Sequence, residues 1–257
     1  MSTHDAAFMR EITPPNRGSV WARLTVFVTF GLLAARLFRL VNRYAVNIFF
    51  WDQWDFYNAT LFQRHSWWQM FAWQHGPHRQ GVGAILSRII EPLFHWNSRG
   101  EAFLACVPFV LGALLALYLK KRLYGPLTYS DALIPLLFFT PLEYESLFGS
   151  TNLSHGPLPI LLLVVYCLGW VYESYAWLLV ANFLLIYTGF GFFAGIITPV
   201  LLTFDYVRRR RAEPPASLTV FLTAQVIALG SLGSFFIGYK FDPAAGCFRP
   251  FSSPPLD

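Results

Sequence analysis

Residues 101–119, EAFLACVPFVLGALLALYL, decide the fold class of this chain. The run is apolar after its first residue, and it has the length needed to cross a bilayer core of about 30 Å. Three basic residues, Lys120, Lys121 and Arg122, follow it directly. Because basic residues gather on the cytoplasmic side of membrane helices, the stretch predicts a transmembrane helix that ends in the cytoplasm.

The composition extends this interpretation to the whole chain. Hydrophobic residues make up 55% of the 257 residues and charged residues 13%, against roughly 25% in a soluble domain. The net charge of +5 comes from basic clusters beside apolar runs, such as residues 208–211, where lipid headgroups and topology explain it. We therefore expect membrane lipids as partners and no nucleic acid. Three scattered cysteines, Cys106, Cys167 and Cys247, supply no disulfide framework or metal spacing.

Hydropathy and the positive-inside rule together predict an all-α polytopic bundle of about seven transmembrane spans in one domain, residues 1–257. Seven spans that start from a cytoplasmic N-terminus place residues 1–20 in the cytoplasm. They place the loop 42–100 and the tail 240–257 outside. The stretch 157–206 leaves two alternatives open, three short spans or one long span, because both preserve sidedness. The predicted spans are 21–41, 101–119, 131–147, 157–172, 175–189, 190–206 and 217–239.

The loop 42–100 is expected to carry helices that lie in the membrane interface. Six of the nine tryptophans fall in it, as in an interfacial aromatic belt, and one such helix is predicted over 57–73. Tryptophan faces also stack on sugar rings, so Trp51 and Trp54 are candidate substrate-binding residues. The six tryptophans are Trp51, Trp54, Trp67, Trp68, Trp73 and Trp96.

Two acids stand near the start of this loop, in residues 51–58, WDQWDFYN. Asp52 and Asp55 are three positions apart, so on a helix they share a face and could bind a divalent cation or divide acid and base roles. Nearby lipid raises the proton affinity of a carboxylate, toward the range useful for a general base. Both are candidate catalytic residues, and the alternative for each is a helix N-cap.

A second polar cluster follows at residues 74–80, QHGPHRQ, in which His75, His78 and Arg79 are candidate substrate-binding residues. A zinc site is not favoured, because no HExxH pattern accompanies the two histidines. The second predicted outer loop, near 143–156, supplies the expected partners of this cluster, and an ordinary polar connector is the alternative. Those candidate partners are Glu143, Glu145, Asn152 and His155.

Three arginines, Arg36, Arg39 and Arg43, lie in the outer third of the first predicted span. Arg36 and Arg43 are seven positions apart and share one helical face. They either extend to the outer headgroups or form a cationic site for a lipid phosphate, which arginine binds with paired hydrogen bonds.

This layout resembles the multi-spanning type C glycosyltransferases, which use polyprenyl-phosphate-linked sugars on the outer face of the membrane. In that superfamily an early acidic motif of the first outer loop carries the catalytic aspartate, and Asp52 stands at the corresponding position. Residues 75–79, HGPHR, are similar to a His-x-x-His-Arg string in bacterial members. The resemblance implies an inverting glycosyltransferase of the bacterial inner membrane, with Asp52 as base and Arg79, Arg36 or Arg43 at the phosphate.

Two departures accompany the resemblance. Pro77 stands where an acid usually precedes the second histidine, and the chain ends soon after its seventh predicted span, whereas relatives continue through further spans. We therefore expect either the N-terminal portion of a longer enzyme or a truncated member, which an additional membrane subunit could accompany. Two alternatives belong to other classes: a lipid or solute transporter, which would place ionisable residues near the midplane, and a noncatalytic scaffold.

Overall fold

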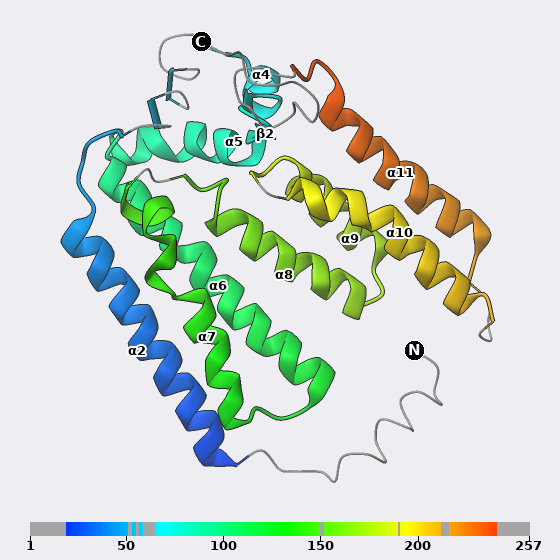
Figure 1. Ribbon diagram of the computed structural model, residues 1–257, viewed down its shortest axis with the longest axis horizontal. Coiled ribbons are helices and arrows are strands. Elements are labelled where there is room, and N and C mark those ends of the chain that lie inside the picture. The colour runs from blue at the N-terminus through cyan, green and yellow to red at the C-terminus, as the bar shows by residue number, and fades with distance from the viewer. Residues whose placement is uncertain are drawn as a thin grey trace, which may run out of the picture.

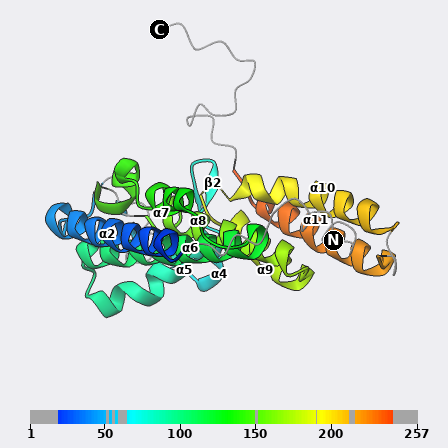
Figure 2. The same ribbon diagram turned by 90° about the horizontal axis from the view of Figure 1, so that it is seen from below.

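The computed structural model describes residues 19–50, 53, 54, 57, 58, 65–149, 152–189, 191–211 and 216–240, and most of these residues are helical. The helices form a flat bundle, as the two views of Figure 1 and Figure 2 show. One side of the bundle holds α2, α6 and α7, the other holds α9, α10 and α11, and α8 lies between them (Figure 1). Their bounds are α2 Val20–Tyr44, α6 Ser98–Tyr124, α7 Leu133–Phe138, α8 Pro157–Val171, α9 Tyr175–Ile186, α10 Phe192–Arg209 and α11 Leu218–Phe236.

The expectation of a helical membrane protein is supported by three of these helices. Helices α2, α6 and α11 are long and apolar enough to cross a membrane. Helices α8 and α9 are also apolar but shorter. The predicted count of seven spans stays a prediction.

Three separate helices occupy the stretch for which the sequence left two alternatives. Helix α8 ends at Val171, and Glu173 then takes a positive φ of 55°, which an α-helix does not contain. Between α9 and α10, Gly191 is required, because a Cβ there would lie 1.9 Å from the carbonyl oxygen of Leu185. One continuous helix through 157–206 is therefore excluded.

The predicted segment 131–147 differs from the structure, because it is not one helix. A short 3-10 turn, η2 (Tyr129–Ala132), leads into α7, which ends at Phe138. The chain continues as η3 (Pro141–Glu143) and a π-helical turn, η4 (Glu145–Gly149). Pro141 explains the break, because proline lacks an amide hydrogen and drives the preceding Thr140 into extended backbone, with ψ of 138°.

One end of the bundle carries most of the loop 42–100, and we call it the loop end. There α5 (Gly81–Ile90) lies across the helix ends, followed by η1 (Glu91–Phe94) (Figure 1). Of the predicted interfacial helix 57–73, the structure has α4 (Trp67–Phe71), and residues 59–64 lie outside the described part. A hairpin that the sequence did not predict, β1 (Gln74–His75) and β2 (His78–Arg79), connects α4 to α5.

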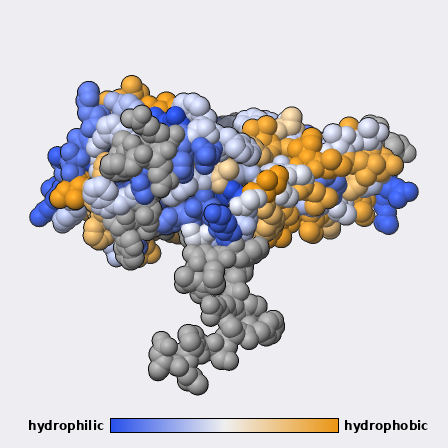
Figure 3. Space-filling model, turned by 90° about the horizontal axis from the view of Figure 1, so that it is seen from above, coloured by the Kyte–Doolittle hydropathy of each residue, from blue (hydrophilic) through white to orange (hydrophobic). Residues whose placement is uncertain are grey.

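The interior holds two main apolar clusters, one around α2 and α6 and one among α8, α9, α10 and α11. Apolar side chains also face outward, and Val200, Phe204 and Val226 are each about two-thirds exposed or more. Seen from the loop end, the surface over α10 and α11 is largely hydrophobic, whereas the opposite half is mostly hydrophilic (Figure 3). A lipid environment explains so large an exposed apolar surface.

Candidate functional site

Two predicted outer segments meet at the loop end through the fully buried side chain of Gln80. The amide of Asn152 donates to Gln80 Oε1 at 2.8 Å, and Gln80 Nε2 lies 2.7 Å from His155 Nε2. Because Gln80 Nε2 is a donor, His155 Nε2 accepts, so His155 is neutral with its proton on Nδ1. The ring of His78 packs edge-on against that of His155, with centroids 5.9 Å apart. The structure thus brings Asn152 and His155 to the cluster 74–80, and it shows no contact of Glu145 with this cluster among the described residues.

Small residues allow this junction to form. The hydroxyl of Ser154 accepts from the amide of Gly83 at 3.0 Å and donates to the carbonyl of Gln80 at 3.2 Å. A Cβ on Gly83 would lie 2.0 Å from Ser154 Oγ, so only glycine permits this approach. The amide of Gly189 donates to the carbonyl of Ser154 at 2.7 Å, which joins the turn after α9 to the same junction.

The two histidines of the hairpin have different surroundings. His78 is partly buried, and this burial lowers its pKa, so the ring is kept neutral. His75 lies beside Trp73, with ring centroids 5.4 Å apart. The ring of His78 also hydrogen-bonds to the backbone of Gly189, in the turn after α9.

The partners of Arg79 are backbone carbonyls and an aromatic ring of the protein itself. The side chain is 3% exposed, and it donates to the carbonyls of Phe235 and Ile237 at 2.6 Å each and to the carbonyl of Ala72. Its guanidinium also faces the ring of Tyr239, 6.0 Å from the centroid. These contacts satisfy the carbonyls at the C-terminal end of α11, and they occupy the guanidinium that the sequence predicts at the phosphate.

Two buried carboxyl groups lie near the same end, and sequence reasoning did not single them out as a site. Glu91 is 1% exposed and Glu101 is 2% exposed. The hydroxyl of Tyr57 donates to Glu101 Oε2 at 2.5 Å, and the amide of Gln53 lies 3.3 Å from the same oxygen. Burial raises the pKa of Glu91 from 4.5 to about 7. The sequence signal for this pair was Glu101, a carboxylate at the first position of the predicted span 101–119.

The candidate catalytic residues Asp52 and Asp55, together with Trp51, lie outside the described residues. Gln53 and Tyr57 belong to the same segment, and both are buried against Glu101. The other candidate substrate-binding residues differ in how far their side chains are exposed to solvent. Trp54 is 54% exposed and packs edge-on against Phe49, Glu145 is exposed, and the side chain of Glu143 is outside the described part.

The three arginines of α2 are exposed along its C-terminal half. Arg36, Arg39 and Arg43 all project from the surface, and the guanidinium of Arg43 lies 5.5 Å from the ring centroid of Tyr44. Their charges are therefore available to lipid headgroups or to a phosphate. The structure is compatible with both alternatives that the sequence left open.

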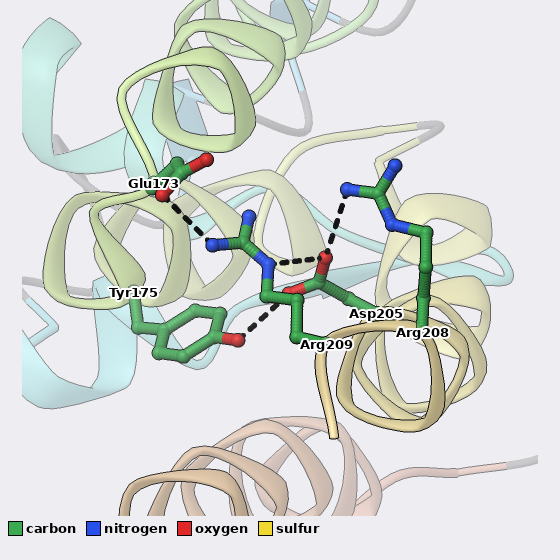
Figure 4. Close-up of polar contacts among 5 residues, drawn as sticks. All are labelled: Glu173, Tyr175, Asp205, Arg208 and Arg209. Carbon is green, nitrogen blue, oxygen red and sulfur yellow. Dashed lines mark hydrogen bonds and ion pairs between the residues drawn. The ribbon is translucent and has the colours of Figure 1, made fainter. Parts of the chain in front are cut away.

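The opposite end of the bundle, which we call the basic end, holds an ion-pair network (Figure 4). Buried Asp205 accepts from Arg209 Nε and from the hydroxyl of Tyr175, each at 2.8 Å, and Arg208 lies 3.7 Å from it. Arg209 also donates to Glu173 at 2.8 Å. The network ties the turn between α8 and α9 to the end of α10, beside the basic run 208–211.

Among the residues that the structure describes, no three His, Cys, Asp or Glu side chains form a group that could hold a metal ion. The segment containing Asp52 and Asp55 is not covered by that search. Comparisons with protein-family models, with curated proteins and with solved structures found no match.

Proposed function

We propose that this chain is a membrane glycosyltransferase-like protein, which transfers a sugar from a polyprenyl-phosphate donor to an acceptor on the extracytoplasmic face. The observation that carries the proposal is the gathering of polar side chains at the loop end. His78, Gln80, Asn152 and His155 come together from two separate segments. In the same end, the segment that contains Asp52 and Asp55 contacts α6 through Gln53 and Tyr57.

The proposed reaction is an inverting displacement at the anomeric carbon. Asp52 takes the proton of the acceptor hydroxyl while that oxygen forms a bond to the anomeric carbon. The bond between this carbon and the phosphate oxygen breaks, and polyprenyl phosphate leaves with the electron pair. Arg36, Arg39 and Arg43 would neutralise the negative charge of the phosphate, since their side chains are exposed and Arg79 is engaged elsewhere.

The donor's lipid chain gives a reason for the membrane location. Helix α2 carries the three arginines near its loop end, and much of its remaining surface is apolar and exposed, as at Trp21, Leu24 and Leu32. A polyprenyl chain could lie along this surface with its phosphate at the arginines. Trp54 is exposed enough to stack on a sugar ring.

Release of polyprenyl phosphate by proteoliposomes tests the proposal. We expect the wild type to release it from at least one member of a panel of polyprenyl-phosphate sugars, with the sugar recovered on an acceptor. Arg36→Gln and Arg43→Gln should raise KM for the donor by roughly tenfold each, because each loses a charged phosphate contact. Arg211→Gln, an exposed arginine at the basic end, is the matched control.

Two further arms separate the alternatives. A chelator added to the assay shows whether turnover requires a divalent cation, which would implicate the two aspartates. Passage of intact donor across the bilayer without release of phosphate would favour a transporter and contradict the proposal. No turnover with any panel member, alone or with a membrane partner subunit, would favour a scaffold.

A further inference from the structure

Three aromatic side chains form a row where the end of α2 meets the turns that follow α7. The ring centroids of Tyr44 and Phe148 are 6.0 Å apart, and those of Phe148 and Tyr144 are 6.2 Å apart. Tyr44 is the last residue of α2, Tyr144 follows η3, and Phe148 lies in η4. The row therefore joins two segments that are distant in the sequence.

The two ends of this row are open to a ligand. Tyr44 is 51% exposed and Tyr144 is 58% exposed, while Phe148 is partly buried between them. The turn that holds Phe148 is π-helical, a rare geometry that is often found at functional sites. An aromatic ring offers an apolar face, on which the C–H groups of a sugar ring can pack. The row is thus a preformed surface for a ring-shaped ligand.

Groups of opposite charge accompany the two exposed rings. The guanidinium carbon of Arg43 lies 5.5 Å from the ring centroid of Tyr44. Glu145 directly follows Tyr144 in the chain, and its side chain is exposed. In the part of the chain that the structure describes, neither charge takes part in an ion pair. Arginine suits a phosphate, and a carboxylate accepts hydrogen bonds from hydroxyl groups.

We propose that this surface binds the sugar phosphate part of the donor, with the phosphate at Arg43 and the sugar ring on the aromatic row. A glycosyl phosphate has its phosphate bonded directly to the sugar ring, so its site needs a cation immediately beside an apolar face, as Arg43 is beside Tyr44. Glu145 accepts hydrogen bonds from the sugar hydroxyls. The inference rests on the proposed function, because Arg43 is assigned there to the phosphate. It adds that Tyr144 and Glu145 determine whether a sugar is bound.

Binding of short-chain donors to the full chain in detergent tests this site without requiring turnover. The probes are citronellyl phosphate and a panel of citronellyl-phosphate hexoses, measured by titration calorimetry. The wild type should bind at least one hexose probe about tenfold more tightly than the sugar-free probe. Tyr144→Ala should lose about fivefold of this preference because the sugar loses a ring contact, and Tyr144→Phe should keep it. Glu145→Gln should weaken the hexose probe alone, and Arg43→Gln should weaken both probes equally.

Tyr124→Ala is the matched control, because Tyr124 is a 73% exposed tyrosine at the other end of the bundle, and it should bind both probes like the wild type. Equal affinity of the wild type for all probes, or no binding of any hexose probe, would overturn the proposal.

A sugar preference that persists unchanged in Tyr144→Ala and Glu145→Gln would also overturn it, and would make the rings anchors in the membrane interface. A preference that depends on Tyr144 in a protein without turnover would support this site and reject the transferase. Turnover with an unchanged preference in Tyr144→Ala would do the reverse. If Tyr144→Ala does not fold, Glu145→Gln decides.

Discussion

Gln80 and His155 are 75 positions apart in the chain, and a 2.7 Å contact between their Nε2 atoms joins them at the loop end. Gln80 is fully buried and also accepts from Asn152, so its side-chain amide uses both of its polar atoms within the protein. The contact fixes the start of α5 against the turn that precedes α8. It is the main polar link between the two segments that the sequence predicts to lie outside.

Replacing Gln80 should therefore destabilise the fold. In Gln80→Ala the Asn152 amide and the His155 ring both lose a buried partner, which costs about 1–3 kcal/mol for each unsatisfied group. We expect a clear fall in Tm, measured by thermal unfolding in detergent. Gln69→Ala is the control, since Gln69 is exposed and only completes the capping box of α4, worth about 1 kcal/mol. An equal fall in Tm for both variants would contradict the importance of the junction.

Arg79→Lys should release the end of α11. Lysine carries a compact ammonium group and cannot reach the separate carbonyls of Ala72, Phe235 and Ile237 that the planar guanidinium contacts. We expect faster hydrogen exchange of residues 236–240 and a loss of roughly 2 kcal/mol in stability. Arg39→Lys, a conservative change at an exposed arginine of α2, should leave both quantities unchanged. Normal protection of residues 236–240 in Arg79→Lys would show that the contacts are dispensable.

The stability contribution of Glu91 should fall as the pH rises from 4.5 to about 7. In this window the unfolded chain has lost its Glu91 proton while the folded protein keeps it, so folding is linked to proton uptake. Each pKa unit corresponds to about 1.4 kcal/mol, and after allowance for partial solvent access the loss is on the order of 2 kcal/mol. Comparing the Tm of the wild type and Glu91→Gln across the window isolates this group. Parallel pH profiles for the two proteins would argue against a raised pKa.

The contact between Glu173 and Arg209 predicts the sidedness of the turn between α8 and α9. If the run 208–211 is cytoplasmic, as the seven-span prediction has it, Glu173 is cytoplasmic too. In a cysteine-free background, Glu173→Cys and Arg211→Cys should react with an impermeant maleimide from the cytoplasmic side, and Lys240→Cys from the other. Labelling of Glu173→Cys from the outer side would contradict the seven-span arrangement.

Parts of this structure follow from local sequence patterns. Helix α6 is evident from its apolar run, and the break after α7 had a signal in Pro141, which the hydropathy average concealed. The meeting of Gln80 with Asn152 and His155 was predictable in outline, because the assigned sidedness put both segments at one end.

Other features depend on distant contacts that no local pattern reveals. Arg79 looks like a free cation in the sequence, yet its partners Phe235 and Ile237 lie more than 150 positions later. Tyr57, Glu91 and Glu101 are likewise spread over three elements, and only packing brings their polar groups together. Such sites require the tertiary structure because burial, rather than residue type, gives the carboxyl groups their properties.

The most direct test of the proposed activity is the turnover of Asp52→Asn, measured as polyprenyl phosphate released by proteoliposomes. Asp55→Asn belongs beside it, with Glu173→Gln at the basic end as a control for folding and reconstitution. We predict that Asp52→Asn loses at least about a hundredfold of the wild-type rate, the contribution of a general base, while its Tm and vesicle insertion match the control. Full activity of a well-folded Asp52→Asn would contradict the assignment of Asp52 as the base, and a wild type without turnover would contradict the transferase itself.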